Sequence, residues 1–173
     1  MAVDFQDAYN RLEKRIESRY GLQVSIGDVI DPNTGDFDGE RIQLDYTLDL
    51  ELAVFVLLHL FGHTVQWNIS EEMREIGVEL KPGIDAGTLH RIFIYERDAT
   101  RFSIQLLHET GLQELDQWAS DWWWADWKYL EHFYKTGEKL NVRELLTPGQ
   151  SERLAPLEVP VFRPQKWVSR WSF

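Results

Sequence analysis

The chain has 173 residues and a mass of 20.5 kDa, the size of one domain. Its 29 acidic and 18 basic residues give a net charge of −11, so we expect neither a direct nucleic-acid partner nor a membrane partner, since phosphate and anionic lipid surfaces require a basic surface. The absence of cysteine excludes disulfides, thiolate zinc ligands and a thiol nucleophile, and leaves histidine and carboxylate as metal ligands. The charged N-terminus does not resemble a signal peptide, and we expect a cytoplasmic protein.

A helix and a small sheet are predicted in the first 45 residues. Apolar residues three and four positions apart predict an amphipathic helix over 4–20, which Gly21 ends. Alternating apolar and polar residues predict short strands at 22–26 and 42–44, and we expect these two strands to pair antiparallel. The connection over 27–40 does not match the spacing of an EF-hand calcium loop, so we expect a surface turn.

Three longer helices follow. The segment 50–67 is apolar nearly all round, which predicts a buried central helix with Asp49 as its N-cap. A polar connection is expected over 68–89. Helical spacing then predicts helices over 91–110 and 115–135.

Five of the eight tryptophans fall between Trp118 and Trp127, on the last of these helices. We expect Trp118 and Trp122 to seal this helix against the core. The other three are the candidates for exposure and binding, namely Trp123, Trp124 and Trp127.

Four prolines and no clear period predict an extended tail from Pro148 onward. Its apolar residues should anchor the tail on the body, and these are Val161, Phe162, Trp167 and Trp171. The predicted fold is a mostly helical α+β single domain over 1–173, with a small antiparallel sheet and an extended C-terminal tail.

One pair of residues in the sequence is suited to binding a metal ion. His59 and His63 are four positions apart on the central helix, so both imidazoles share one face and can reach one metal ion. The alternative is that both are structural core histidines with ordinary hydrogen bonds.

The surrounding sequence resembles the ImmA/IrrE-type zinc metallopeptidases over about residues 22–110. The phrase LLHLFGHTVQW is similar to the helix that carries the His-Glu-x-x-His motif of these zincins, and RIQLDYTLDLELAVFVLLH is similar to their edge strand and helix start. YERDATRFSIQLLHETG is similar to their second helix, where a Glu lies ten residues before a Leu-Leu pair. The resemblance implies a zincin-like core over about 22–110. It does not cover the N-terminal helix or the segment 113–173, where we expect the Trp-rich helix and a C-terminal wrap.

By this resemblance His59, His63 and Glu96 are the metal ligands, and zinc is the implied cofactor. Two imidazoles and one carboxylate leave the fourth tetrahedral position of zinc open. Taken alone, Glu96 also fits a solvated glutamate in the first turn of its helix.

The motif departs from the family at Leu60, which stands where the zincins have the glutamate that acts as general base. Leucine cannot accept or donate a proton, so the resemblance implies a pseudoenzyme with no catalytic residue at this position. Glu51, Asp98 and Glu109 are the nearest candidates for a relocated base, and none is well placed by sequence.

The predicted function is therefore a zinc metallopeptidase-like protein that lacks efficient proteolysis and acts through metal binding or through a protein or peptide partner, in a regulatory role. Two alternatives stay open. One is an active metallopeptidase with an unusual base, and the other is an interaction protein without metal, in which the histidines are structural. The sequence does not specify an oligomeric state.

Overall fold

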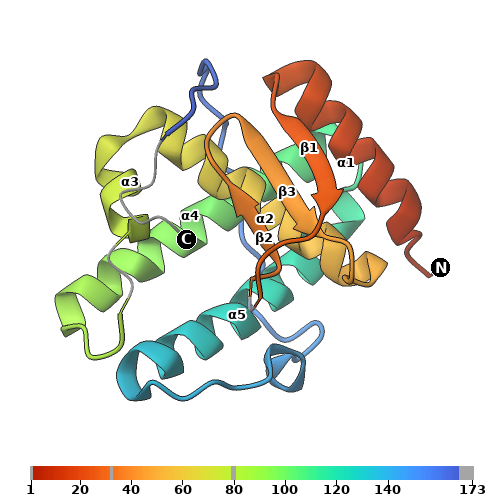
Figure 1. The fold of residues 1–173 in the computed structure, drawn as a ribbon. Coiled ribbons are helices and arrows are strands. Elements are labelled where there is room, and N and C mark those ends of the chain that lie inside the picture. Colours follow the sequence, from red (N-terminus) through yellow and green to blue (C-terminus); the bar gives the residue numbers. More distant parts are fainter. Residues whose placement is uncertain (1, 32, 79–80, 168–173) are drawn as a thin grey trace.

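Two long helices, α2 and α4, cross at the centre of the molecule, and a small sheet lies against α2 (Figure 1). The computed structural model describes residues 2–31, 33–78 and 81–167. Within them the fold is α+β and mostly helical, as the sequence predicts.

Helix α1 spans Phe5–Tyr20, close to the predicted range. It begins at Asp4, whose carboxylate accepts hydrogen bonds from two backbone N–H groups of the first turn. It ends at Gly21, which has a φ of 68° and so adopts the left-handed conformation that favours glycine.

The sheet contains β1 (Gln23–Gly27), β2 (Gly35–Phe37) and β3 (Arg41–Asp45) in the order β1-β3-β2. β1 pairs parallel with β3, and β2 pairs antiparallel with β3, so the predicted antiparallel pairing of the first and last strands is wrong. The reason is β2 itself, which lies in the segment expected to form only a turn. The chain reverses direction once between β1 and β2 and again in the hairpin of β2 and β3. β3 therefore runs parallel to β1.

Helix α2 spans Leu50–Ile69 and begins at Asp49, the predicted N-cap, whose side chain accepts from the Leu52 N–H at 2.9 Å. By length and composition it is the one helix among the described residues that could cross a membrane. However, 67% of the window that meets this criterion is buried inside the fold. α2 is thus the central core helix that the sequence predicts.

The remaining helices differ from prediction mainly at their starts. Helix α3, Glu71–Val78, lies in the segment expected to be a connection. Helix α4 spans Ala86–Glu109 and begins five residues earlier than predicted, because Asp85 caps it by accepting from the Thr88 N–H at 2.8 Å. Helix α5 spans Asp116–Thr136 and is flanked by two 3₁₀ turns, Gln113–Leu115 and Val142–Leu145.

The buried apolar residues form two clusters. The larger one joins α1, the sheet and α2 to the second half of α4. The smaller one is centred on four buried side chains of α4 and α5: Ile92, Trp123, Trp127 and Tyr134. Trp123 and Trp127 are therefore buried, contrary to the prediction, and Trp124 is half-buried. Trp122 is buried as predicted, and Trp118 is partly buried and packs against the larger cluster, also as predicted.

Residues 152–167 lie along the body in an extended conformation. The Leu157 N–H donates to the Arg101 carbonyl at 3.1 Å, and the Trp167 N–H donates to the Asp38 carbonyl at 2.7 Å. Phe162 stacks on Tyr20 with ring centroids 5.9 Å apart.

Two of the four predicted tail anchors, Phe162 and Trp167, contact the body, and the Arg74 guanidinium lies 3.6 Å above the Trp167 ring. Val161 is 98% exposed and anchors nothing, because its neighbour Phe162 takes the inward-facing position. Trp171 lies outside the described residues.

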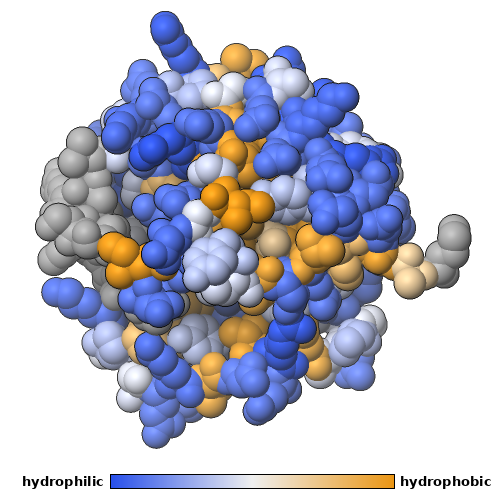
Figure 2. All heavy atoms as spheres, turned by 45° about the vertical axis from the view of Figure 1, so that its right-hand side comes forward, coloured by the Kyte–Doolittle hydropathy of each residue, from blue (hydrophilic) through white to orange (hydrophobic). Residues whose placement is uncertain are grey.

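The face shown in Figure 2 is mostly hydrophilic, with separate patches of hydrophobic side chains. The large apolar residues of the described chain with more than half of their surface exposed are Ile26, Ile30, Tyr46 and Val161.

Candidate metal centre

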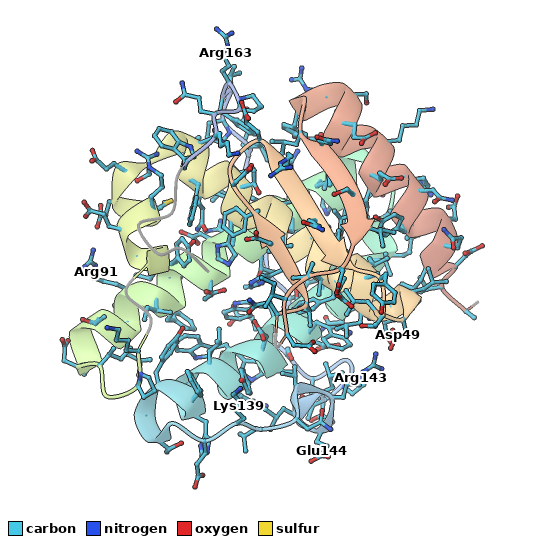
Figure 3. All side chains as sticks on the ribbon, viewed as in Figure 1. Asp49, Arg91, Lys139, Arg143, Glu144 and Arg163 are labelled. Carbon is cyan, nitrogen blue, oxygen red and sulfur yellow. The ribbon has the colours of Figure 1, made fainter. Side chains whose placement is uncertain are left out.

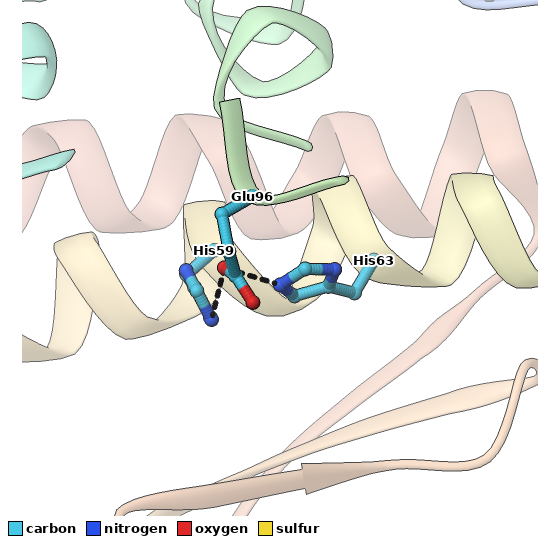
Figure 4. Close-up of side chains that lie close together, drawn as sticks. All are labelled: His59, His63 and Glu96. Carbon is cyan, nitrogen blue, oxygen red and sulfur yellow. Dashed lines mark hydrogen bonds and ion pairs between the residues drawn. The ribbon is translucent and has the colours of Figure 1, made fainter. Parts of the chain in front are cut away.

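The predicted ligand residues lie together where α2 crosses α4. His59 and His63 project from α2 and Glu96 projects from α4 between the two imidazole rings (Figure 4). The Glu96 Oε2 atom lies 3.1 Å from His63 Nε2 and 3.8 Å from His59 Nε2. One ligand atom from each of the three residues lies within 4.8 Å of the other two. Glu96 is 5% exposed and sits in mid-helix, so the alternative of a solvated first-turn glutamate is wrong.

His63 is held by a chain of two hydrogen bonds. The Gln66 Nε2 donates to the Tyr95 carbonyl at 2.7 Å, which fixes the amide and leaves Gln66 Oε1 as an acceptor 2.8 Å from His63 Nδ1. His63 Nδ1–H therefore donates to Gln66, and Nε2 faces Glu96. Such an outer partner is the usual support of a metal-binding histidine, because it fixes both the tautomer and the ring orientation. Sequence reasoning missed Gln66, although it lies three residues after His63 on the same helix face.

The two histidines differ in charge. Burial and the positive charge of His63 together lower the pKa of His59 to about 4, against the opposing effect of Glu96, so His59 is neutral at pH 7. Burial also acts against protonation of His63, but the negative charge and hydrogen bond of Glu96 outweigh it and raise the pKa of His63. Burial favours the neutral carboxyl of Glu96, yet the charge of His63 holds the pKa of Glu96 below its usual value. His63 and Glu96 thus form a buried ion pair beside a neutral His59.

The close approach of the two helices depends on Gly62. A Cβ atom at this position would lie 2.1 Å from the backbone oxygen of Ala99 on α4. Only glycine allows this crossing, which brings Glu96 to the histidines of α2. The glycine between the two histidines therefore has a structural role in the site.

Leu60 is buried beside the site and carries no titratable group. One of its methyl groups reaches Gly35 of β2, where an added Cβ would lie 2.6 Å away. The residue after His59 therefore makes an apolar contact between α2 and the edge of the sheet.

A cleft of about 580 Å³ opens above His59. Its apolar floor comes from α2 and α5 and includes Leu52, Phe55, Leu60 and Trp122. The loop before β2 and the segment 139–143 form its polar rim. At the edge of the cleft Arg143 forms an ion pair with Asp49, with an N–O distance of 2.5 Å (Figure 3).

Asp126 lines the same cleft, and sequence reasoning missed it. It projects from α5 and is half-buried. Burial, and then the negative charge of Glu96, raise the pKa of Asp126 to about 7. Within the described part of the chain its carboxyl group makes no hydrogen bond or ion pair. The spacing of residues along the Trp-rich helix gave no signal for this position.

The other carboxylates considered as a relocated base are engaged elsewhere. Glu51 accepts hydrogen bonds from the indoles of Trp118 and Trp122, at 3.0 and 3.3 Å. Asp98 pairs with two arginines of its own helix. Glu109, about 20 Å along α4 from Glu96, binds Arg15 and the Tyr20 hydroxyl.

The donor set fits a divalent metal ion. Ligand atoms about 2.1 Å from a tetrahedral zinc ion lie about 3.4 Å from one another, and the two distances from Glu96 to the histidines lie on either side of this value. Two imidazoles and one carboxylate are also the protein ligands of many catalytic zinc sites. The structure therefore contains a buried His-His-Glu group that could hold a metal ion.

No family model matches the chain, and no curated protein or solved structure matches it.

Proposed function

We propose that the protein binds a divalent metal ion, zinc by preference, through His59, His63 and Glu96, and that it is a metallopeptidase-like protein without efficient proteolysis. The observation that carries the proposal is the meeting of three ligand atoms within 4.8 Å, with His63 already oriented by Gln66. Burying such a group is costly, and a bound dication would offset that cost by coordination.

Leu60 supports the second half of the proposal. When bound, a metal ion of this kind polarises a carbonyl group and activates water. Peptide cleavage also needs a group that moves a proton to the leaving amine, and positioned acid–base groups typically contribute ~10²–10⁴ in rate. Leu60 offers none, and Glu51, Asp98 and Glu109 are held by other partners. Asp126 is the carboxylate of the cleft through which the alternative, an active enzyme with an unusual base, would have to act.

The cleft supports a role in binding. Its apolar floor and polar rim suit a polypeptide segment that inserts an apolar side chain, and His59 lies at its surface. We therefore propose a protein or peptide partner, bound next to the metal, as the route by which the protein acts.

Metal content tests the first part. Protein purified without chelator or affinity metal, then equilibrated with Zn²⁺ and desalted, should retain one zinc per chain by mass spectrometry. His59→Ala and His63→Ala should lose it, whereas His90→Ala, which replaces an exposed histidine outside the group, should not. A wild-type chain that retains no metal would favour the interaction protein with structural histidines.

Peptidase assays test the second part. The zinc-loaded wild type should not cleave casein detectably, and Leu60→Glu should raise cleavage by at least ~10² if the remaining geometry is intact. Zinc-dependent cleavage by the wild type that His59→Ala abolishes would contradict the proposal and support the active enzyme with an unusual base.

A further inference from the structure

We infer that Asp126 is the second carboxylate of the metal centre and that its negative charge is required for tight binding of a divalent cation. The inference rests on the metal site proposed above and adds a residue from α5, which the ligand motif does not include. The juxtaposition that supports it is the position of Asp126 and His59 in the lining of one cleft.

The first argument is the lack of any other partner for Asp126. A carboxylate that is withdrawn from water is normally hydrogen-bonded or paired with a cation. The buried aspartates follow this rule, since Asp45, Asp116 and Asp121 each accept hydrogen bonds. Asp126 is half-buried in the lining of the cleft and has no such partner among the described residues. A cation in the neighbouring site would supply the missing partner.

The second argument is proximity. Asp126 and His59 line the same cleft, and the charges of Glu96 and His63, two members of the ligand set, act on Asp126. The negative charge of Glu96 disfavours an ionised Asp126, and a cation bound between them would offset this repulsion. Asp126 is outside the group whose ligand atoms lie within 4.8 Å, so we assign it a role beside the metal rather than as a direct ligand.

The third argument is charge balance. Coordination requires neutral imidazoles, so His59 and His63 contribute no charge to a loaded site. Glu96 alone would leave a net charge of +1 in a largely buried position. Glu96 and Asp126 together neutralise a dication, which removes the cost of an uncompensated buried charge. This balance also favours a divalent over a monovalent or trivalent ion.

The test compares Asp126→Asn with the wild type by competition of each protein with a chromogenic chelator for Zn²⁺. Loss of an outer partner of a metal site typically costs 10–100-fold in metal affinity, and we expect a weakening in this range. Glu131→Gln is the matched control, because it removes one negative charge from the same helix at an exposed position paired with Lys135. Its zinc affinity should stay within about twofold of the wild type.

The melting temperature is a second measurement, which shows whether Asp126 acts through its charge or through the stability of the fold. In the metal-free protein the Asp126 carboxyl group makes no hydrogen bond or ion pair with the described residues, so metal-free Asp126→Asn should melt at the same or a higher temperature than the wild type. Added Zn²⁺ should then raise the melting temperature of the wild type more than that of the variant.

Three outcomes are informative. Failure of the wild type to bind Zn²⁺ would remove the proposed function and this inference with it. Normal zinc affinity in Asp126→Asn would overturn the inference alone and leave the His-His-Glu site intact. Weaker zinc binding together with a lower metal-free melting temperature would also overturn it, because Asp126 would then act through the fold.

Discussion

The crossing of α2 and α4 at Gly62 makes Gly62→Ala a direct test of how the two ligand helices are held together. The added Cβ would lie 2.1 Å from the Ala99 oxygen and 2.6 Å from its carbonyl carbon. Both are backbone atoms, so no change of side-chain rotamer relieves the clash. To restore a contact of 3.0 Å, α4 must move away from α2 by about 0.9 Å.

This displacement has a cost in stability. Overpacking of a well-packed core typically costs 1–3 kcal/mol, and a clash between two backbones belongs at the upper end. Alanine is better than glycine in a helix by up to ~1 kcal/mol, which offsets part of the loss. We therefore expect Gly62→Ala to lower the free energy of unfolding by about 2 kcal/mol, measured by urea denaturation.

The same displacement moves Glu96 away from the histidines. Metal–ligand distances are tolerated within about 0.2 Å, so a shift of about 0.9 Å should weaken zinc binding at least tenfold. Gly87→Ala is the control, since it makes the same change near the start of α4, where the nearest atom is an Asp85 carboxylate oxygen 3.2 Å away. Its stability should change by less than about 0.5 kcal/mol. A Gly62→Ala protein with the stability and zinc affinity of the wild type would refute the role assigned to this crossing.

Two further predictions concern the segment that follows α5. Asp121 accepts hydrogen bonds from the Gly149 and Ser151 N–H groups, and Asp121→Asn should cost about 1–3 kcal/mol of stability by urea denaturation near pH 7. Burial raises the pKa of Asp121, but these hydrogen bonds outweigh it and hold the pKa below its usual value, so the wild type should lose its advantage over the variant as the pH falls below about 4. An advantage that grows in acid would contradict this. A chain that ends at Leu154 loses the partly buried Leu157, Val159 and Phe162, and its unfolding free energy should fall by about 2–3 kcal/mol; an unchanged melting temperature would show that the tail does not stabilise the body.

Local signals in the sequence predict much of this fold. α1 and α2 follow from apolar spacing, from Gly21 at the end of α1 and from the N-cap Asp49 of α2, because helix periodicity and capping depend on residues close together in the chain. β2 has three residues, too few for alternation to show. The parallel pairing of β1 with β3 is a contact between distant segments, which no local pattern encodes.

The residues of the candidate site also differ in whether a local sequence pattern indicates them. His59 and His63 are recognisable because four residues of helix bring them to one face, and Glu96 was found through the family resemblance. Gln66 had a weak local signal. Asp126 had none, because its approach to the site depends on how α5 packs against the rest of the molecule.

The division of the apolar interior into two clusters has a consequence for cooperativity. The histidine-bearing helix belongs mainly to the larger cluster, through residues such as Leu57 and Phe61, whereas Ile92, one turn before Glu96, belongs to the smaller one. Clusters of this kind can open separately, each with its own free energy. An ion shared by α2 and α4 would have to be released before the smaller cluster could open without the larger one. Metal occupancy would thus join two folding units into one that opens as a whole, and the first half of α4 would gain protection from local opening that its own packing does not provide.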